Sequence, residues 1–533
     1  MTESARKPSW SPSASGPGGS GPARRLAVLA LLVVASGFTV AALACPMPLL
    51  LRVLQDDGFY YVGIAVNWVS GLPSTFDGIQ PTNGYHPLWQ ILALVPAWFV
   101  RDPEWLARTL MVIGVWMCVA SAFLFESYLR RVGSSLAAGS LLWMTCAMIP
   151  APIYGMETAL AILACALCLA EWPVAAEHYT ARRGAFCGLA AAALFLARLD
   201  TLPFLAAMAL VAVFGQPRQR RSRWSFALPL IAVEAAAVLG YFASNWILWG
   251  HLASVSVLAK AGRTAPFHPW LIHLGTILGL ALVTSLAALL WLVRRLRHRE
   301  LGNGIPTGAL WLALGTLGYM AVAFCAGGVE TYGWYFGVVA ASGAVLLPLW
   351  LDPGEAVRHP RLAQASWELL YLCLAATAWV LVLTWVKPVS FVKDYRVAEV
   401  LAHLPPGRLV FAATDCGIRG SVSRQHCLNL DGLTGSYEFQ EALRDDRFVE
   451  WLRRVGLNCC FGPVEHVPAS PTATTALWTR PGMNGVAREA LLTVRWPAAY
   501  EAAGVSVYTV LAIDRPDPPP AGAPRGMRPP TAP

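Results

Sequence analysis

Asp56-Asp57-Gly58-Phe59-Tyr60-Tyr61 follows the first long apolar segment of the chain, and a second polar stretch at residues 81–89 lies in the same predicted loop. Two adjacent carboxylates at a membrane boundary are disfavoured by desolvation and by mutual repulsion, so such a pair usually serves chemistry or holds a cation. The alternative is a solvated loop whose acids mark a helix start, where their charge meets the helix dipole. The role of the acidic pair therefore depends on what surrounds it.

Composition places the pair in a membrane protein. The chain has 533 residues, of which 56% are hydrophobic and only 13% charged, and its mean hydropathy is +0.51. Soluble domains carry about a quarter charged residues, so this composition predicts an all-α polytopic membrane protein. The net charge of +9 does not indicate a nucleic-acid partner, because the basic residues fall in short clusters between apolar segments, as topology signals do.

Apolar segments and basic clusters alternate along the chain. They predict about eleven transmembrane helices, with the N-terminus cytoplasmic and the C-terminus outside, in a bacterial cytoplasmic (inner) membrane. The predicted segments are 26–43, 105–125, 134–150, 156–172, 184–200, 202–215, 225–249, 270–293, 307–326, 334–351 and 365–387. The stretch 88–100 is too short to cross and is expected to lie along the outer interface.

Composition also divides the chain into four parts. We predict a disordered cytoplasmic tail at 1–23, a transmembrane domain at 24–389 with a first outer loop at 47–104, a small extracytoplasmic α/β domain at 390–513, and a Pro-rich disordered tail at 514–533. The α/β prediction rests on alternating helix-like and strand-like pieces. The expected helices are 395–404 and 448–455, and the expected strands are 408–413, 427–430 and 505–513.

The predicted topology brings further polar residues to the outer side of the membrane. They are Glu157, Arg198, Asp200, Lys260, Arg263 and Tyr335. Ionisable groups that recur at one membrane face indicate a functional site. Carboxylates could deprotonate a hydroxyl or hold a divalent cation, and the basic residues could neutralise a phosphate. The alternatives are a salt bridge between Arg198 and Asp200, a helix start at Glu157, and an interfacial aromatic belt for Tyr60 and Tyr335.

Several motifs resemble those of a known family. The first stretch, together with 82–89, 155–158, 197–200 and 429–433, is similar to a bacterial branch of the GT-C superfamily of polyprenyl-phosphate-sugar-dependent glycosyltransferases. More distantly, the chain resembles the arabinofuranosyltransferases and the protein O-mannosyltransferases. The resemblance covers most of residues 26–465. In place of an acidic residue that some branches carry later in the first loop, this chain has His86, which leaves a metal requirement open.

The resemblance implies transfer of a sugar from a polyprenyl-phosphate donor to an acceptor hydroxyl, with inversion. The acceptor would be an envelope glycan, lipid or protein at the outer face of the membrane. Asp56 or Asp57 would be the base, with Asp56 favoured, and the pair would also be the ligands of any divalent cation. The predicted substrate-binding residues are His86, Asn83, Tyr60, Glu157, Arg198, Asp200, Lys260, Arg263 and Tyr335. A multi-span transporter or lipid flippase, and a non-catalytic envelope-assembly partner, are the alternatives.

Overall fold

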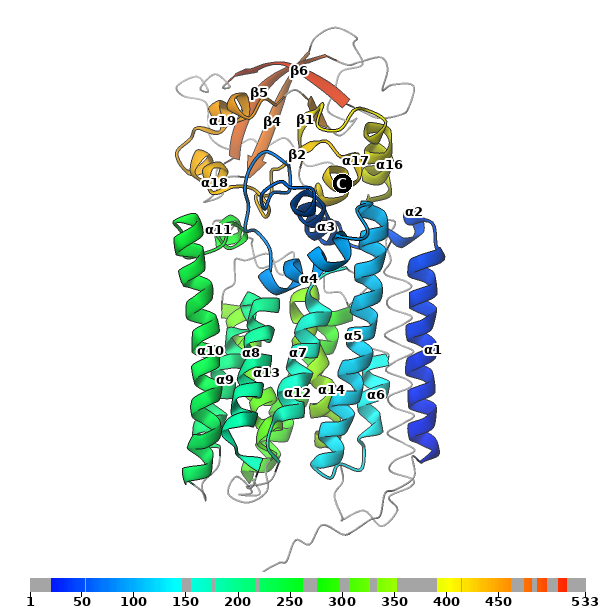
Figure 1. The fold of residues 1–533 in the computed structure, drawn as a ribbon, viewed down its shortest axis with the longest axis vertical. Helices are drawn as coiled ribbons and strands as arrows, with labels where there is room; N and C mark the ends of the chain where they lie inside the picture. Colours follow the sequence, from blue (N-terminus) through cyan, green and yellow to red (C-terminus); the bar gives the residue numbers. More distant parts are fainter. Residues whose placement is uncertain are drawn as a thin grey trace, which may run out of the picture.

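A bundle of helices carries a smaller α/β region at one end (Figure 1). The computed structural model describes residues 21–52, 54–145, 155–174, 178–215, 220–261, 276–297, 306–325, 333–351, 391–413, 415–457, 459–461, 474–481, 487–495 and 507–514. The first loop and the C-terminal region lie at the same end of the bundle. The start of α1 and the end of α5 lie at the opposite end (Figure 1).

The bundle helices are rich in Ala, Leu and Val. They are α1 (Pro22–Ala44), α5 (Pro103–Arg131), α6 (Ala138–Trp143), α7 (Thr158–Glu171), α8 (Ala181–Ala197), α9 (Leu202–Phe214), α10 (Arg220–Trp249), α12 (Thr276–Arg297), α13 (Thr307–Cys325) and α14 (Gly337–Leu351). A helix lies at each predicted segment from 26–43 to 334–351. The segment 365–387 lies outside the described residues. Helix α1 begins at Pro22, so it starts inside the predicted tail.

Three helices of the described part are long and apolar enough to cross a membrane: Pro22–Ala44, Pro103–Arg131 and Arg223–Trp249. Others, such as α7 and α9, are shorter than the roughly 20 residues that a straight crossing needs. These helices make the chain an integral membrane protein, and the count of eleven spans stays a prediction. Helix α5 has a side-chain cap, because Asp102 accepts the N–H groups of Glu104 and Trp105 at 3.1 Å.

Shorter helices build the other end of the molecule. They are α2 (Met47–Leu50), α3 (Asp56–Val69), α4 (Pro87–Ala97), α11 (Val255–Ala261), α16 (Phe391–Ala402), α17 (Gly417–Ser423), α18 (Tyr437–Arg444) and α19 (Phe448–Arg454), with short 3₁₀ turns η4 (Leu199–Thr201) and η7 (Gly333–Phe336). The predicted helices 395–404 and 448–455 correspond to α16 and α19. Helices α17 and α18 were not predicted; α17 contains Gly417 and Gly420, and glycine has low helix propensity.

In its described residues, the C-terminal region forms a mixed six-stranded sheet. Its strands are β1 (Val410–Ala413), β2 (His426–Asn429), β3 (Cys459–Phe461), β4 (Thr474–Pro481), β5 (Ala487–Arg495) and β6 (Val507–Asp514), in the order β2-β1-β3-β6-β5-β4. Strand β1 runs parallel to β2 and β3, and the remaining pairs are antiparallel. The predicted strands 408–413, 427–430 and 505–513 correspond to β1, β2 and β6. Helix α17 is the crossover between β1 and β2, and this places its N-terminus beside the first loop.

Candidate active site on the two faces of α3

Helix α3 presents its acidic pair to two different surroundings. Successive helical residues are rotated by 100°, so Asp56, Tyr60 and Gly63 share one face, while Asp57 and Tyr61 share another. The first face packs against α17, where Ser421 Oγ donates to the Phe59 carbonyl at 2.7 Å. The second face points to Glu157, as the contacts of Tyr61 show. The two carboxylates therefore have different roles.

Asp56 is buried and caps a helix of another part of the chain. One carboxylate oxygen accepts the Gly417 N–H at 2.7 Å and the other accepts the Ile418 N–H at 2.8 Å, so Asp56 serves as the N-terminal cap of α17. A Cβ at Gly417 would lie 2.1 Å from the Asp56 carbonyl oxygen, so this approach requires glycine. Burial raises the pKa of Asp56 to about 8, and the two backbone donors oppose that rise. The preference for Asp56 as the base does not fit these contacts.

Tyr60 and Asn83 also connect the first loop to distant segments. The Tyr60 hydroxyl accepts the Cys416 N–H at 3.2 Å and an Asn429 amide N–H at 2.6 Å. The Asn83 amide donates to Asn245 and to the Tyr437 hydroxyl, each at 2.9 Å. Tyr60 and Asn83 were predicted to bind substrate, but in the structure they hold segments of the chain together. They are not part of the network of ionic groups described next.

Asp57 is half-buried at the start of α3. No hydrogen bond to its carboxylate is present among the described residues, in contrast to the two that Asp56 accepts. Burial raises the pKa of Asp57 to about 7, and the positive charge of Lys260 acts against that rise. A carboxyl that titrates near neutral pH and keeps its lone pairs available is suited to accept a proton.

Glu157, Arg198 and Asp200 form a chain of ion pairs beside Asp57. Arg198 donates to Glu157 at 2.7 Å and to the two Asp200 oxygens at 3.1 and 2.8 Å. Tyr61 and Tyr319 donate to the same carboxylates at 2.8 and 2.7 Å. The side chains of Glu157 and Arg198 are each only 1% exposed. Since Arg198 is paired with two carboxylates, the expectation that it binds a phosphate does not fit its surroundings.

Lys260 and Tyr335 complete the cluster. The Lys260 ammonium donates to the Tyr335 hydroxyl at 2.6 Å, and Arg198 lies over the same ring at 5.1 Å from its centroid. Burial lowers the pKa of Lys260, but the Tyr335 hydroxyl and the charge of Asp57 outweigh it and raise the pKa overall. The ammonium therefore stays charged, and no carboxylate pairs with it directly among the described residues.

His86 joins the cluster from the start of α4. Its Nδ1 accepts the Leu199 N–H at 3.3 Å, and its Nε2 lies 3.6 Å from Glu157 Oε1. Burial lowers the pKa of His86, so the ring is neutral at pH 7, and its one proton sits on Nε2 because Nδ1 accepts. The imidazole thus orients Glu157 without adding a charge.

The structure brings most of the predicted residues together and adds others. His86, Glu157, Arg198, Asp200, Lys260 and Tyr335 form one contact network, whereas Arg263 lies outside the described residues. Sequence reasoning missed Tyr319 and the Gly417–Ile418 amides. The glycine-rich 417–420 stretch was the available signal for those amides, because glycine permits the close approach that α3 makes.

The donor set of this site does not match a two-carboxylate metal site. Both Asp56 oxygens accept backbone N–H groups, which leaves Asp57 alone to offer oxygen ligands from the pair. In the part of the chain that the structure describes, no three His, Cys, Asp or Glu side chains come together as metal ligands. Divalent cations in proteins take several oxygen ligands. The expected cation ligation by Asp56 and Asp57 as a pair is therefore not supported by the geometry.

The fold matches solved membrane enzymes, although no family model and no curated protein matches the sequence. ArnT from Cupriavidus metallidurans in the apo state has a TM-score of 0.54 at 13% identity, over 90% of this chain and 97% of that one. The same protein bound to undecaprenyl phosphate gives 0.50, with the same identity and coverage. An oligosaccharyltransferase from Archaeoglobus fulgidus, tethered to an acceptor peptide, gives 0.50 at 12% identity over 83% and 69%. At this identity the likeness shows the fold alone: the chain has the fold of ArnT and of the oligosaccharyltransferase, in agreement with the resemblance to the GT-C superfamily.

Proposed function

We propose that the chain is an integral membrane glycosyltransferase that moves a sugar from a polyprenyl-phosphate donor to an acceptor hydroxyl. The observation that carries this proposal is that Asp57, a half-buried carboxyl without a hydrogen-bond partner among the described residues, lies within the electrostatic influence of the half-buried cation Lys260. Sugar transfer from a phosphate needs one base for the acceptor and one positive charge for the leaving phosphate. Undecaprenyl phosphate bound to ArnT supports a donor of this class.

Asp57 acts as the base in the proposed reaction. Its carboxylate takes the proton of the acceptor hydroxyl while the hydroxyl oxygen attacks the anomeric carbon. The bond from that carbon to the phosphate oxygen breaks, and the polyprenyl phosphate leaves with the electron pair. A single displacement inverts the anomeric configuration. The products are the glycosylated acceptor, the lipid phosphate and a protonated Asp57, which returns its proton to water.

Lys260 binds the phosphate, and the Glu157–Arg198–Asp200 chain holds the site together. The ammonium already donates to Tyr335, so its remaining protons are available to phosphate oxygens. Arg198 lies over the Tyr335 ring, and Lys260 donates to the hydroxyl of the same residue. The positive charge is thereby positioned before the donor arrives, which is what electrostatic stabilisation of a leaving group requires.

The site would face the outside of a bacterial cytoplasmic membrane. Arg24, at the start of α1, pairs with Glu126 near the end of α5, and Arg130 follows one turn later. Basic residues at this end of the bundle indicate the cytoplasmic side. The α3 end then lies outside, with the region 390–513 as an extracytoplasmic domain. The acceptor in this proposal is an envelope glycan, lipid or protein, which accords with the tethered peptide in the oligosaccharyltransferase.

Replacing Lys260 with glutamine is expected to weaken donor binding by about 10- to 100-fold. A charge-assisted hydrogen bond to a desolvated phosphate contributes about 1.5–3 kcal/mol, and glutamine keeps a donor but not the charge. Binding of a radiolabelled polyprenyl-phosphate sugar to purified protein measures the effect. Lys393→Gln, on the exposed side of α16, is the control and should bind as wild type. Equal donor affinity in Lys260→Gln and wild type would remove Lys260 from the site.

Transfer activity is expected to rise with pH up to about pH 7 and then level off. The raised pKa of Asp57 leaves its carboxyl protonated below about pH 7, where it cannot accept the acceptor proton. Below that value kcat/KM should fall about tenfold per pH unit. An aspartate with an ordinary pKa near 4 would instead give a flat profile from pH 5.5 upward. Transfer from the radiolabelled donor, measured between pH 5 and 9, distinguishes these profiles, and the flat one would exclude Asp57 as the base.

A further inference from the structure

Asn83 of the first loop contacts three segments that lie far apart in the sequence. Its amide nitrogen donates to Asn245 Oδ1 in α10 and to the Tyr437 hydroxyl in α18, each at 2.9 Å. Its Oδ1 accepts the Val255 N–H at 3.1 Å, at the start of α11. Asn83 is only 6% exposed, and both N–H groups of its amide are used in these contacts. The side chain therefore serves the chain itself rather than a substrate.

The Asn83 oxygen holds the N-terminus of α11. The first N–H groups of a helix have no partner within the helix, and Asn83 satisfies that of Val255. Helix α11 runs from Val255 to Ala261 and has seven residues. A helix of this length has little stability of its own. Its position therefore depends on the groups outside the helix that hold it.

The segment that leads into α11 is held by the same neighbours. The Tyr437 hydroxyl donates to the Ala253 carbonyl at 2.7 Å, and the Tyr437 ring stacks on His251 with 4.0 Å between the centroids. The Asn245 amide donates to the Leu252 carbonyl at 3.4 Å. Figure 1 shows α11 beside the end of α10 and next to α18, in agreement with these contacts. The first loop and the C-terminal region thus fix the chain where it enters α11.

Lys260 lies on α11, five residues after Val255, which is about 7.5 Å along the helix axis. Its ammonium donates to the Tyr335 hydroxyl at 2.6 Å. Because the lysine stem is flexible, the place of its backbone limits the positions that the ammonium can reach. A movement at the start of α11 would therefore move the charge that the proposed function places on the donor phosphate.

We propose that Asn83 is a positioning residue, which fixes α11 so that the Lys260 ammonium lies where the phosphate of the lipid donor binds. Tyr437 serves the same purpose from the C-terminal region, because its hydroxyl bonds both Asn83 and the Ala253 carbonyl. This inference rests on the proposed function, in which Lys260 binds that phosphate. Neither Asn83 nor Tyr437 contacts the substrate in this role.

Binding of undecaprenyl phosphate, and of undecaprenol, which lacks the phosphate, tests the positioning role. Dissociation constants are measured by microscale thermophoresis on the purified full-length protein in detergent. Asn83→Ala is expected to weaken binding of undecaprenyl phosphate about three- to tenfold, because the lost hydrogen bonds act through the Lys260 charge. Binding of undecaprenol should not change. The double variant N83A/K260Q should bind undecaprenyl phosphate no more weakly than Lys260→Gln, since both positions act on one contact.

Tyr437→Phe is the milder variant, because it removes one hydroxyl and keeps the ring that stacks on His251. It should act in the same direction as Asn83→Ala, and it keeps the test available if Asn83→Ala does not fold. Tyr395→Phe is its matched control. That change removes a hydroxyl that donates to Glu104 at 2.7 Å, in another contact between the C-terminal region and the bundle. Tyr395→Phe should bind undecaprenyl phosphate as wild type does.

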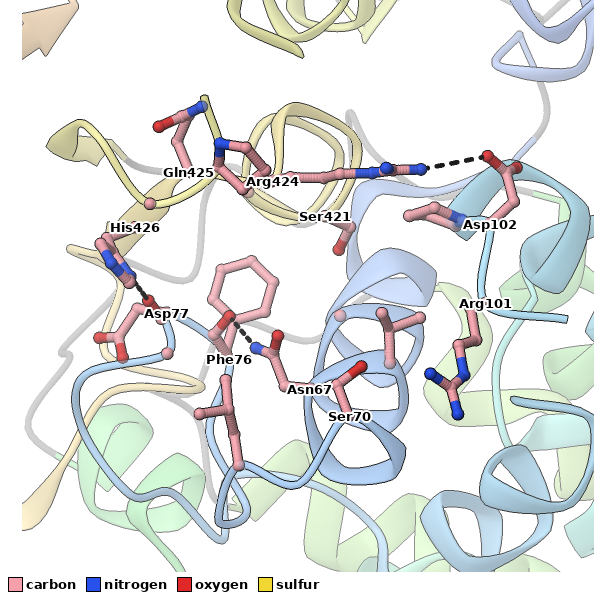
Figure 2. A pocket seen from close by; sticks show the side chains of 18 residues that line it. Asn67, Ser70, Phe76, Asp77, Arg101, Asp102, Ser421, Arg424, Gln425 and His426 are labelled. Carbon is pink, nitrogen blue, oxygen red and sulfur yellow. Dashed lines mark hydrogen bonds and ion pairs between the residues drawn. The ribbon is translucent and has the colours of Figure 1, made fainter. Parts of the chain in front are cut away.

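Asn67→Ala is the matched control for the asparagine. The Asn67 amide donates to the Thr75 and Phe76 carbonyls, each at 3.0 Å, so it joins parts of the first loop to one another and not to α11 (Figure 2). Binding of undecaprenyl phosphate by Asn67→Ala should equal that of wild type.

Three results would overturn the inference. Wild-type binding of undecaprenyl phosphate by both Asn83→Ala and Tyr437→Phe, with weaker binding by Lys260→Gln, would keep the phosphate site and exclude only the positioning role. An equal loss of undecaprenol binding would mean that Asn83 merely stabilises the fold. Wild-type binding by Lys260→Gln would refute the proposed phosphate site, and the positioning role with it.

Discussion

The Asp57→Asn variant is expected to lose at least 100-fold in sugar transfer while it folds like wild type. The amide keeps the shape of the side chain but cannot accept a proton from a hydroxyl, and general-base catalysis contributes about 10²–10⁴-fold. No described residue hydrogen-bonds to the Asp57 carboxylate, so its replacement breaks no structural contact there. Transfer from a radiolabelled donor and thermal unfolding in detergent measure the two effects.

Asp56→Asn is the matched comparison. It is expected to lower the stability of the protein and to affect sugar transfer less than Asp57→Asn does. One amide oxygen can replace only one of the two acceptors that hold Gly417 and Ile418, and the NH₂ group would face the other backbone donor. Leaving one buried backbone N–H without an acceptor costs about 1–3 kcal/mol, which would appear as a lower unfolding temperature. Full transfer activity in Asp57→Asn would refute the assigned base, and wild-type stability of Asp56→Asn would refute the cap. Equal inactivation of both variants, mimicked by a chelator, would instead indicate a shared metal.

Arg198→Met is expected to destabilise the protein by about 3–5 kcal/mol. Removing one member of a buried ion pair leaves the other charge without a partner, and here Glu157 would be left at 1% exposure. A phosphate-binding arginine would behave differently, because its loss would weaken donor binding and leave the unfolding temperature nearly unchanged. Thermal unfolding of the purified variant in detergent therefore separates the structural role from the phosphate role.

The double variant R198M/E157Q provides the control for this prediction. Glutamine at position 157 is uncharged and can still accept from the Tyr61 hydroxyl, so part of the stability should return. Coupling between the two positions is the signature of a direct pair. If R198M/E157Q is no more stable than Arg198→Met, the buried pair is not the reason for the loss.

The bundle could be predicted from the sequence because apolar length and basic clusters are local signals. The segments at 105–125 and 225–249 contain helices for that reason, and the residues Glu157, Arg198, Asp200 and Lys260 lie together as the topology implied. The side chains with which these residues interact could not be predicted from local signals. Arg198 was expected to face a phosphate, because a sequence does not show that two carboxylates already surround the guanidinium.

The roles of Asp56 and Asp57 depended on a contact between distant parts of the chain. Helical periodicity separates the two side chains by 100°, but it does not say which face meets the C-terminal region. That choice is made by Gly417, whose missing side chain lets α17 approach the Asp56 backbone. The motifs around the acidic pair could therefore locate the candidate site, but they could not show which of the two aspartates acts as the proposed base.

The cap of α17 by Asp56 has a consequence for the biogenesis of the protein. The carboxylate and its partners Gly417 and Ile418 are 361 and 362 residues apart. At about 5–20 residues per second, the ribosome needs roughly 20 to 70 s to make the intervening chain. During that time the first loop lacks Gly417 and Ile418, the residues whose backbone N–H groups bind Asp56 at the start of α3. The half-made chain thus lacks the contact that holds the start of α3 in place until the C-terminal region has been made and has docked against the first loop.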